Sequence, residues 1–242
     1  MHNPAADSAV TEALVKFALA PLIDRRVLSA ASYAVSQARE RVVAAGDAGQ
    51  RVAALLRSQG STSEDTRVRA WVLGAVLATH TESPATAVLA TAIHMGDKLA
   101  ASDEQIGAAA AVGMEASARL LAAVDSEEFR WRWNVSSALG VLGATLSVAR
   151  LLQLDEARTR HALGIAATQT AGLARNASSP MAAIETGKAA ADAIEAALLA
   201  KHGFTSAAAA IDGRRGFAAL LAYRFDASCI TEGLGVNWIS LD

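Results

Sequence analysis

Apolar residues recur along most of the chain at the spacing of an amphipathic helix. Leu14, Phe17 and Ala18 fall on one helical face, and the segments 52–56 and 71–76 repeat the same i, i+3, i+4 pattern. β-Branched runs are few and alanine is frequent, which also favours helix. The pattern predicts a chain built from helices.

Polar residues mark where many of these helices begin. Asp24 and Asp155 stand where N-caps are expected, and Ser102 with Gln105 forms a capping-box pattern before an apolar run. Pro84 and Pro180 each follow a serine, as proline does in a first helical turn. Three glycines are predicted to stop helices: Gly60, Gly96 and Gly203. We therefore expect an all-α fold, a bundle of about ten helices.

Two helices are predicted to lie in the centre of the bundle. Residues 136–152 carry Gly140 and Gly143 on a stripe of small residues that lets a neighbouring helix come close. Residues 162–173 are almost free of charge, and their polar residues at 168–170 would need hydrogen-bond partners if buried. The last residues, 237–241, alternate apolar and polar types and predict a strand, although no second strand is evident.

The composition argues against several classes of function. The chain has 242 residues, of which 59 are alanine, and its 22 Lys and Arg against 24 Asp and Glu give a net charge of −2. A charge-driven nucleic-acid binder is not expected, and neither a membrane span nor an export signal is evident. The single cysteine, Cys229, cannot form an internal disulfide and is expected to be a small buried hydrophobe. These features indicate a cytoplasmic protein.

The order of segments resembles the MmgE/PrpD family, which includes 2-methylcitrate dehydratase, cis-aconitate decarboxylase and iminodisuccinate epimerase. The resemblance runs from about residue 12 to 238 and is most specific over 136–221. The matching stretches are LVKFAL, RAWVLGAVLATH, SPATAVLATAI, SSALGVLGATLSVARLLQLDEARTRHALGIAATQTAGL, TGKAAADAIEAALLAKHGFTSAAAAIDGRRGFAALLA and ITEGLGVNW.

Family members combine a dimerising helical domain with an α/β lid domain. The resemblance thus implies one helical domain over residues 1–236 and, at 237–242, a stub where the lid would begin. It implies a homodimer, or pairing with a full-length family member. It also implies a small-molecule substrate.

The family's catalytic motifs are altered in this chain. The histidine of the family's HPS motif is replaced by Ser83, and that of FHPT by Asn134. The family's KxxHxG motif reads Ala182 and Glu185 before Gly187. Proton transfer needs a base, and holding a carboxylate needs a cation or a hydrogen-bond donor, so a remodelled site is expected.

The matching positions give a set of candidate site residues. The predicted catalytic residues are His80, Glu185 and Asn134, as bases and oxyanion donor. The predicted substrate-binding residues are Thr79, Arg132, Lys188, Ser83 and Ser136.

Each candidate also has a purely structural interpretation. His80 could be a helix-end histidine bonded to backbone, and Glu185 with Lys188 could form an ordinary ion pair within a helix. Arg130 and Arg132 could stack on the neighbouring tryptophans at the surface.

No cluster of His, Cys and acidic residues has metal-ligand spacing, so neither a metal nor another cofactor is expected. Three functions remain open. The first is a lyase or isomerase acting on a small carboxylate-bearing or enolisable metabolite. The others are a non-catalytic partner subunit and a ligand-binding protein without chemistry.

Overall fold

The fold is all-α, as the sequence predicts. The computed structural model describes residues 8–43, 47–62 and 64–241, and within these it has twelve α-helices and no β-strand. The helices are α1 (Ala9–Leu19), α2 (Arg25–Val43), α3 (Asp47–Ser58), α4 (Thr66–Ala78), α5 (Ala85–Lys98), α6 (Asp103–Val124), α7 (Glu127–Arg132), α8 (Val135–Leu151), α9 (Glu156–Thr168), α10 (Met181–Lys201), α11 (Phe217–Leu221) and α12 (Ser228–Thr231). Two short 3₁₀ helices follow Leu173 and Trp238: η1 (Ala174–Asn176) and η2 (Ile239–Leu241).

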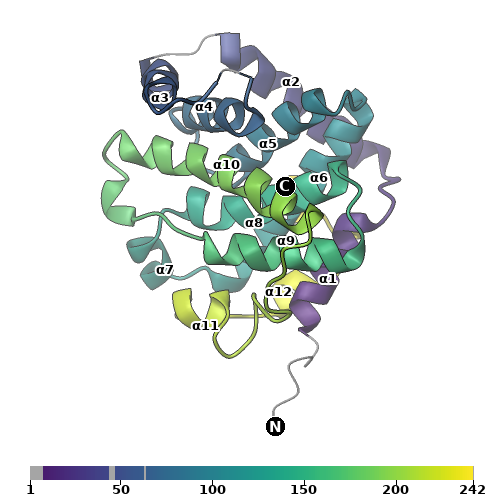
Figure 1. Cartoon of the computed structure of the whole chain (residues 1–242). Helices are drawn as coiled ribbons and strands as arrows, with labels where there is room; N and C mark the ends of the chain where they lie inside the picture. Colours follow the sequence, from purple (N-terminus) through teal and green to yellow (C-terminus); the bar gives the residue numbers. More distant parts are fainter. Residues whose placement is uncertain (1–7, 44–46, 63, 242) are drawn as a thin grey trace.

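Helix α8 forms the centre of the bundle. It packs against α5, α6, α9 and α10, and nearly all its residues are buried. Helix α10 crosses the molecule beside it and covers α4, α8 and α9 (Figure 1). The buried position predicted for residues 136–152 is thus confirmed.

Glycines set how closely the central helices approach. A Cβ atom added at Gly143 of α8 would lie 2.3 Å from the backbone oxygen of Gly113 in α6. A Cβ atom added at Gly187 of α10 would lie 2.3 Å from the backbone oxygen of Trp71 in α4. Both contacts are far below a normal van der Waals distance, so each crossing requires a residue without a side chain.

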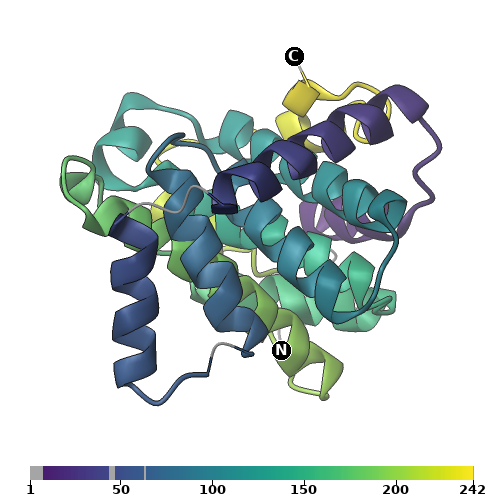
Figure 2. The ribbon, with the colours of Figure 1, turned by 90° about the horizontal axis from the view of Figure 1, so that it is seen from above.

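Helix α3 lies at the edge of the bundle, beside α4 (Figure 2). Val52 and Leu56 bury one face of α3 against Ala75 of α4, in a small core separate from the main one. Leu55, although on the predicted apolar face, is largely exposed.

Most predicted helix ends are confirmed. Asp155 caps α9, and Ser102 and Gln105 form the capping box of α6. The hydroxyls preceding Pro84 and Pro180 accept the backbone N–H groups of the first residues of α5 and α10.

Two predicted helix ends are wrong. Gly96 does not stop a helix, because α5 continues to Lys98. The predicted helix over 162–173 ends at Thr168, and the chain then turns back toward the start of α8. The side-chain oxygens of Gln169 and Thr170 are buried and have no hydrogen-bond partner among the described residues.

The strand predicted at 237–241 is also wrong: η2 stands there instead. The backbone N–H groups of Ile239 and Ser240 donate to the carboxylate of Glu115 in α6. The ring of Trp238 packs on Phe17 of α1, with the ring centres 5.5 Å apart. The apolar positions of this segment therefore pack against helices rather than pairing as a strand.

One helix in the described part of the chain, α6, is long and apolar enough to cross a membrane. Most of its apolar stretch is buried inside the bundle. The core helix of a globular domain has the same character, so this is weak evidence for a membrane span.

Candidate functional site

A cavity of about 570 Å³ lies where the end of α4, the start of α8 and the start of α10 converge. Its size suits a small metabolite. Its lining comprises Ala78, Thr79, Thr81, Glu82, Pro84, Leu121, Arg130, Trp133, Asn134, Val135, Ser136, Ala174, Ala177, Ser178, Ser179, Pro180, Ala182, Ala183 and Thr186. Hydroxyl groups thus dominate its polar surface.

The cavity forms because three helix ends meet the segment that follows α9. The backbone N–H of Asn134 donates to the carbonyl of Gly172 over 3.1 Å, in an isolated antiparallel bridge between Trp133 and Leu173. The hydroxyl of Ser137 donates to the carbonyl of Ala171 over 2.8 Å. These bonds fix the returning chain against the start of α8.

Asn134 and Glu185 meet beside this cavity. The Nδ2 atom of Asn134 donates to Oε2 of Glu185 over 3.0 Å and to the carbonyl of Ala182 over 3.3 Å. Its Oδ1 atom accepts the backbone N–H of Ser137, which makes Asn134 the N-cap of α8. The second oxygen of Glu185 accepts from the amide of Asn176 over 2.5 Å. The structure therefore brings together two residues that the sequence placed in one site.

Of the other predicted residues, Thr79 and Ser136 line the cavity. The hydroxyl of Thr79 donates to the carbonyl of Val76 at the end of α4, and Ser136 is buried in the first turn of α8. Ser83 does not line the cavity; its hydroxyl accepts the backbone N–H of Ala85 instead.

Lys188, Arg132 and His80 are outside the cavity lining and exposed. The ammonium of Lys188 pairs with Asp192 one turn further along α10, at 2.6 Å, and not with Glu185. Burial raises the pKa of Asp192 although Lys188 opposes this shift. A three-residue spacing along a helix did not bring Lys188 and Glu185 to one cavity.

Arg130, not Arg132, is the arginine that lines the cavity. Its guanidinium pairs with the carboxylate of Asp125, at 2.5 and 2.9 Å, and thereby lowers the pKa of Asp125. Of the two tryptophans beside it, Trp131 is 81 % exposed, whereas Trp133 donates its indole N–H to the carbonyl of Leu221 over 3.1 Å.

The sequence reasoning missed Glu82, an exposed carboxylate in the cavity lining with no ion pair or hydrogen bond to another described residue. It also missed the hydroxyls of Ser178, Ser179 and Thr186. The serines lie just before Pro180, and this helix-start signal could have indicated that they border the site.

In the described part of the chain no three His, Cys, Asp or Glu side chains group in a way that could hold a metal ion. No histidine among the described residues lines the cavity. The described side chains at this site that could accept a proton are therefore the carboxylates of Glu82 and Glu185.

Two comparisons with known proteins bear on this site. The family model of the MmgE/PrpD N-terminal domain matches residues 75–229, which contain the whole cavity lining. Human cis-aconitate decarboxylase is 32 % identical over 112 residues, which are 46 % of this chain and 23 % of that protein. The match thus spans about a quarter of that relative's length. Since the family model covers more than half of the chain, the protein belongs to the MmgE/PrpD family.

Proposed function

We propose that this protein is a lyase or isomerase of the MmgE/PrpD type. It would bind a small carboxylate-bearing or enolisable metabolite in the 570 Å³ cavity. The observation that carries the proposal is the convergence, at this cavity, of the helix ends that hold Thr79, Asn134 and Ser136. Family membership and the partial likeness to cis-aconitate decarboxylase support the same reaction class.

Glu82 is the group that we assign to proton transfer. Its carboxylate lies in the cavity lining and is unpaired within the described residues, so it is available to accept a proton from a substrate carbon. Glu185 was predicted for this role, but both its oxygens accept hydrogen bonds from amides. These bonds hold the carboxylate in place, so Glu185 would position Asn134.

The cavity also offers groups to hold a substrate. The hydroxyls of Ser136 and Ser178 can donate hydrogen bonds to a carboxylate or a carbonyl, whereas those of Ser179 and Thr186 already donate to the carbonyls of Asn176 and Ala182. Arg130 would supply positive charge from the rim while it remains paired with Asp125. A reaction that moves a proton next to a carbonyl needs this combination of base and donors, and the proposal invokes no cofactor.

The test follows deuterium from solvent into a substrate. The protein is incubated in D₂O with cis-aconitate and a panel of small di- and tricarboxylates, and the products are followed by NMR. Glu82→Gln should lower any turnover by about 10² or more, as removal of a general base does. Glu195→Gln, a change on the exposed face of α10, is the matched control and should leave turnover unchanged. Unchanged turnover in Glu82→Gln would refute the assignment of the base.

His80 and Glu185 are tested in the same assay. Glu185→Gln should reduce turnover less than Glu82→Gln, because its effect reaches the substrate only through Asn134. His80→Ala should leave turnover unchanged, since His80 is exposed and outside the cavity lining. A large loss in His80→Ala would restore the role predicted from the sequence.

One observation favours a second function, binding without catalysis. Both N–H groups of the Asn134 amide are already used by Glu185 and Ala182, so no free oxyanion donor remains there. In that case cis-aconitate or a related anion would bind in calorimetry without turnover. Removal of Glu82 would then change affinity only.

We also propose self-association, as the family resemblance implies. Exposed apolar side chains such as Trp131 and Tyr223 support this proposal. Sedimentation velocity at micromolar concentration should show a dimer. A monomer across that concentration range would argue against self-association. So would a chain that forms a dimer only after a full-length family member is added.

A further inference from the structure

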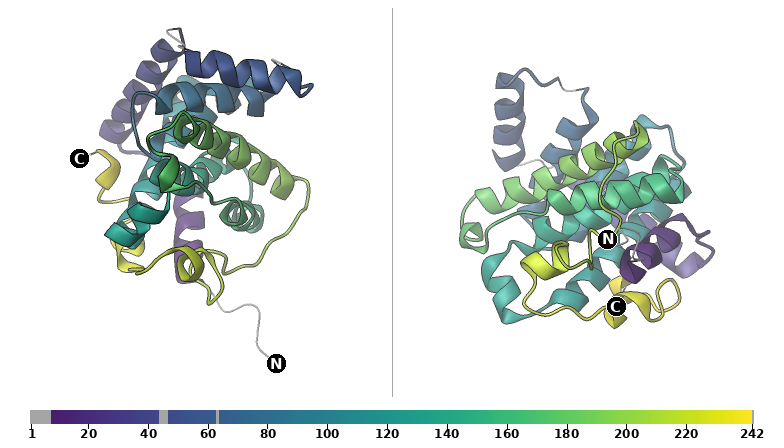
Figure 3. Two further views of the ribbon diagram at one scale, coloured as in Figure 1. Left: turned by 90° about the vertical axis from the view of Figure 1, so that its left-hand side faces the viewer. Right: turned by 60° about the horizontal axis from the view of Figure 1, so that its bottom comes forward.

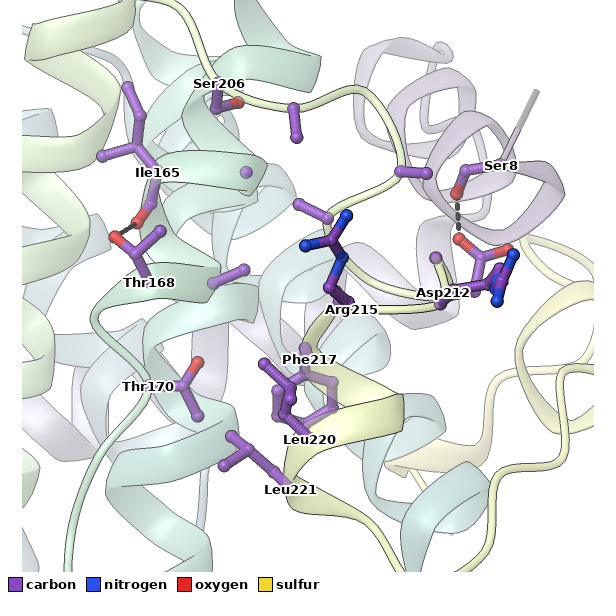
Figure 4. Close-up of a pocket in the computed structure, with 18 of the residues that line it drawn as sticks. Ser8, Ile165, Thr168, Thr170, Ser206, Asp212, Arg215, Phe217, Leu220 and Leu221 are labelled. Atoms are coloured by element: carbon purple, nitrogen blue, oxygen red, sulfur yellow. Dashed lines mark hydrogen bonds between the residues drawn. The ribbon is translucent and has the colours of Figure 1, made fainter. Parts of the chain in front are cut away.

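A second and larger cavity, of about 1350 Å³, lies beside the end of α9. It is bounded by the end of α9 and by the segment 205–221 (Figure 4). This segment contains α11 and runs along the outside of the bundle (Figure 3). Among the residues that the structure describes, the cavity shares no lining residue with the site described above. The proposed reaction does not use it.

This cavity has a positive side. Arg214 and Arg215 both line it, are exposed, and pair with no acidic residue in the described part of the chain. Figure 4 shows the guanidinium of Arg215 across the cavity from Thr168 of α9. Asp212 is the one acidic residue among the described residues of the lining, and its carboxylate accepts from the Ser8 hydroxyl and from the Val10 N–H, 3.3 Å away, at the start of α1.

Backbone hydrogen bonds and close contacts constrain the loop that carries the two arginines. The backbone N–H of Gly213 donates to Ala209, and that of Phe217 to Ala210, over 3.1 and 2.8 Å. A Cβ atom added at Gly213 would lie 2.3 Å from the carbonyl oxygen of Ala209, and one at Gly216 would lie 2.6 Å from that of Ala210. The backbone on either side of the arginines is therefore closely packed, which fixes where the two side chains start before any ligand arrives.

Apolar side chains line both walls of the cavity. Ile165 lies on the α9 wall, whereas Phe217, Leu221 and Leu220, which is 70 % exposed, lie on the same segment as Arg215 (Figure 4). Covering a leucine this exposed with an apolar group lowers the free energy by about 25 cal/mol for each Å² of apolar surface removed from water.

We propose that this cavity binds an organic anion that carries a carboxylate or a phosphate at one end and an apolar chain at the other. The arginines would hold the charged end with charge-assisted hydrogen bonds, and Arg215 is placed to do so from inside the cavity. Ile165, Phe217 and Leu220 would cover the chain. The site is independent of the proposed reaction.

Calorimetry with octanoate and octyl phosphate tests this proposal, with octanol and inorganic phosphate as the neutral and the chainless probes. At least one amphipathic anion should bind. Octanol and phosphate should bind at least about tenfold more weakly, because octanol lacks the charged group and phosphate lacks the apolar chain. Arg215→Gln and Leu220→Ser should each weaken binding, the former by about tenfold or more. Arg51→Gln, an exposed arginine on α3, is the matched control and should bind as the unchanged chain does.

Three results would overturn the proposal. The first is that neither amphipathic anion binds saturably. The second is that octanol binds as tightly as octanoate, since charge would then play no part. The third is unchanged affinity in Arg215→Gln while circular dichroism shows the variant folded. Glu82→Gln, which belongs to the other cavity, should bind these probes normally, so failure of one proposal does not imply failure of the other.

Discussion

Arg119 and Glu115, one turn apart on α6, form an ion pair at 2.6 Å that is almost completely buried. The guanidinium of Arg119 also donates to five backbone carbonyls between Cys229 and Asn237. Glu115 in turn accepts the backbone N–H groups of Ile239 and Ser240. Two charged side chains of a core helix thus hold the C-terminal segment against the bundle.

Arg119→Met should destabilise the protein by about 3–5 kcal/mol, the cost of leaving one member of a buried ion pair without its partner. Five carbonyls would lose their donor at the same time. Chemical denaturation measures the free energy of unfolding. Arg67→Met, which breaks the exposed pairs with Asp65 and Glu195, is the control and should cost less than about 2 kcal/mol. Equal small losses in both variants would contradict the role given to Arg119.

Gly143→Ala should cost about 1–3 kcal/mol, because the added methyl group would meet the backbone of Gly113 and the hydroxyl of Ser117. Ser147→Ala on the same helix is the control. Its hydroxyl is buried and has no hydrogen-bond partner within the described residues, so its removal should be neutral or stabilising. Thermal and chemical unfolding of both variants measure these changes in the free energy of unfolding. A Gly143→Ala protein as stable as the unchanged chain would show that α6 and α8 can separate freely.

His94 should make the protein sensitive to acid. Burial is the main cause that lowers its pKa from 6.5 to about 4; the nearby Asp97 opposes this shift, and Arg69 and Arg39 add to it. The folded state therefore disfavours the charged form. The stabilisation is complete above pH 6.5 and is lost as the pH falls toward 4, by about 3 kcal/mol in total. His94→Gln should abolish this part of the pH dependence, measured as the free energy of unfolding between pH 7 and 4. Parallel curves for the two proteins would contradict the prediction.

Trp133→Phe should loosen α11, because the indole N–H of Trp133 holds the carbonyl of Leu221 at the end of that helix. The expected cost is about 0.5–1.5 kcal/mol. Hydrogen exchange should accelerate in residues 217–221 more than in α8. Trp131→Phe changes an exposed ring of α7, two residues before Trp133, and should leave exchange as it was. Equal exchange in both variants would mean that the bond does not hold α11.

Local signals in the sequence were enough to predict the fold class. Helical periodicity, the capping box at Ser102 and the cap at Asp155 depend on residues within one or two turns, and each formed as predicted. The glycine stripe of residues 136–152 was also visible, because a smooth helix face implies a close neighbour whichever helix that is. The family, too, was evident from the order of these segments.

Long-range contacts decided the rest. Residues 237–241 alternate like a strand, yet Ile239–Leu241 form a 3₁₀ helix, and Glu115, more than a hundred positions earlier, accepts the N–H groups of Ile239 and Ser240. Of the candidate site residues, Asn134 and Glu185 meet, whereas Lys188 turns to Asp192. Spacing along one helix does not predict which residue a charged side chain pairs with, because that depends on where the helix ends and which segments pack on it. The sequence thus determined the helices and their family, and the packing of distant helix ends determined which residues share a cavity.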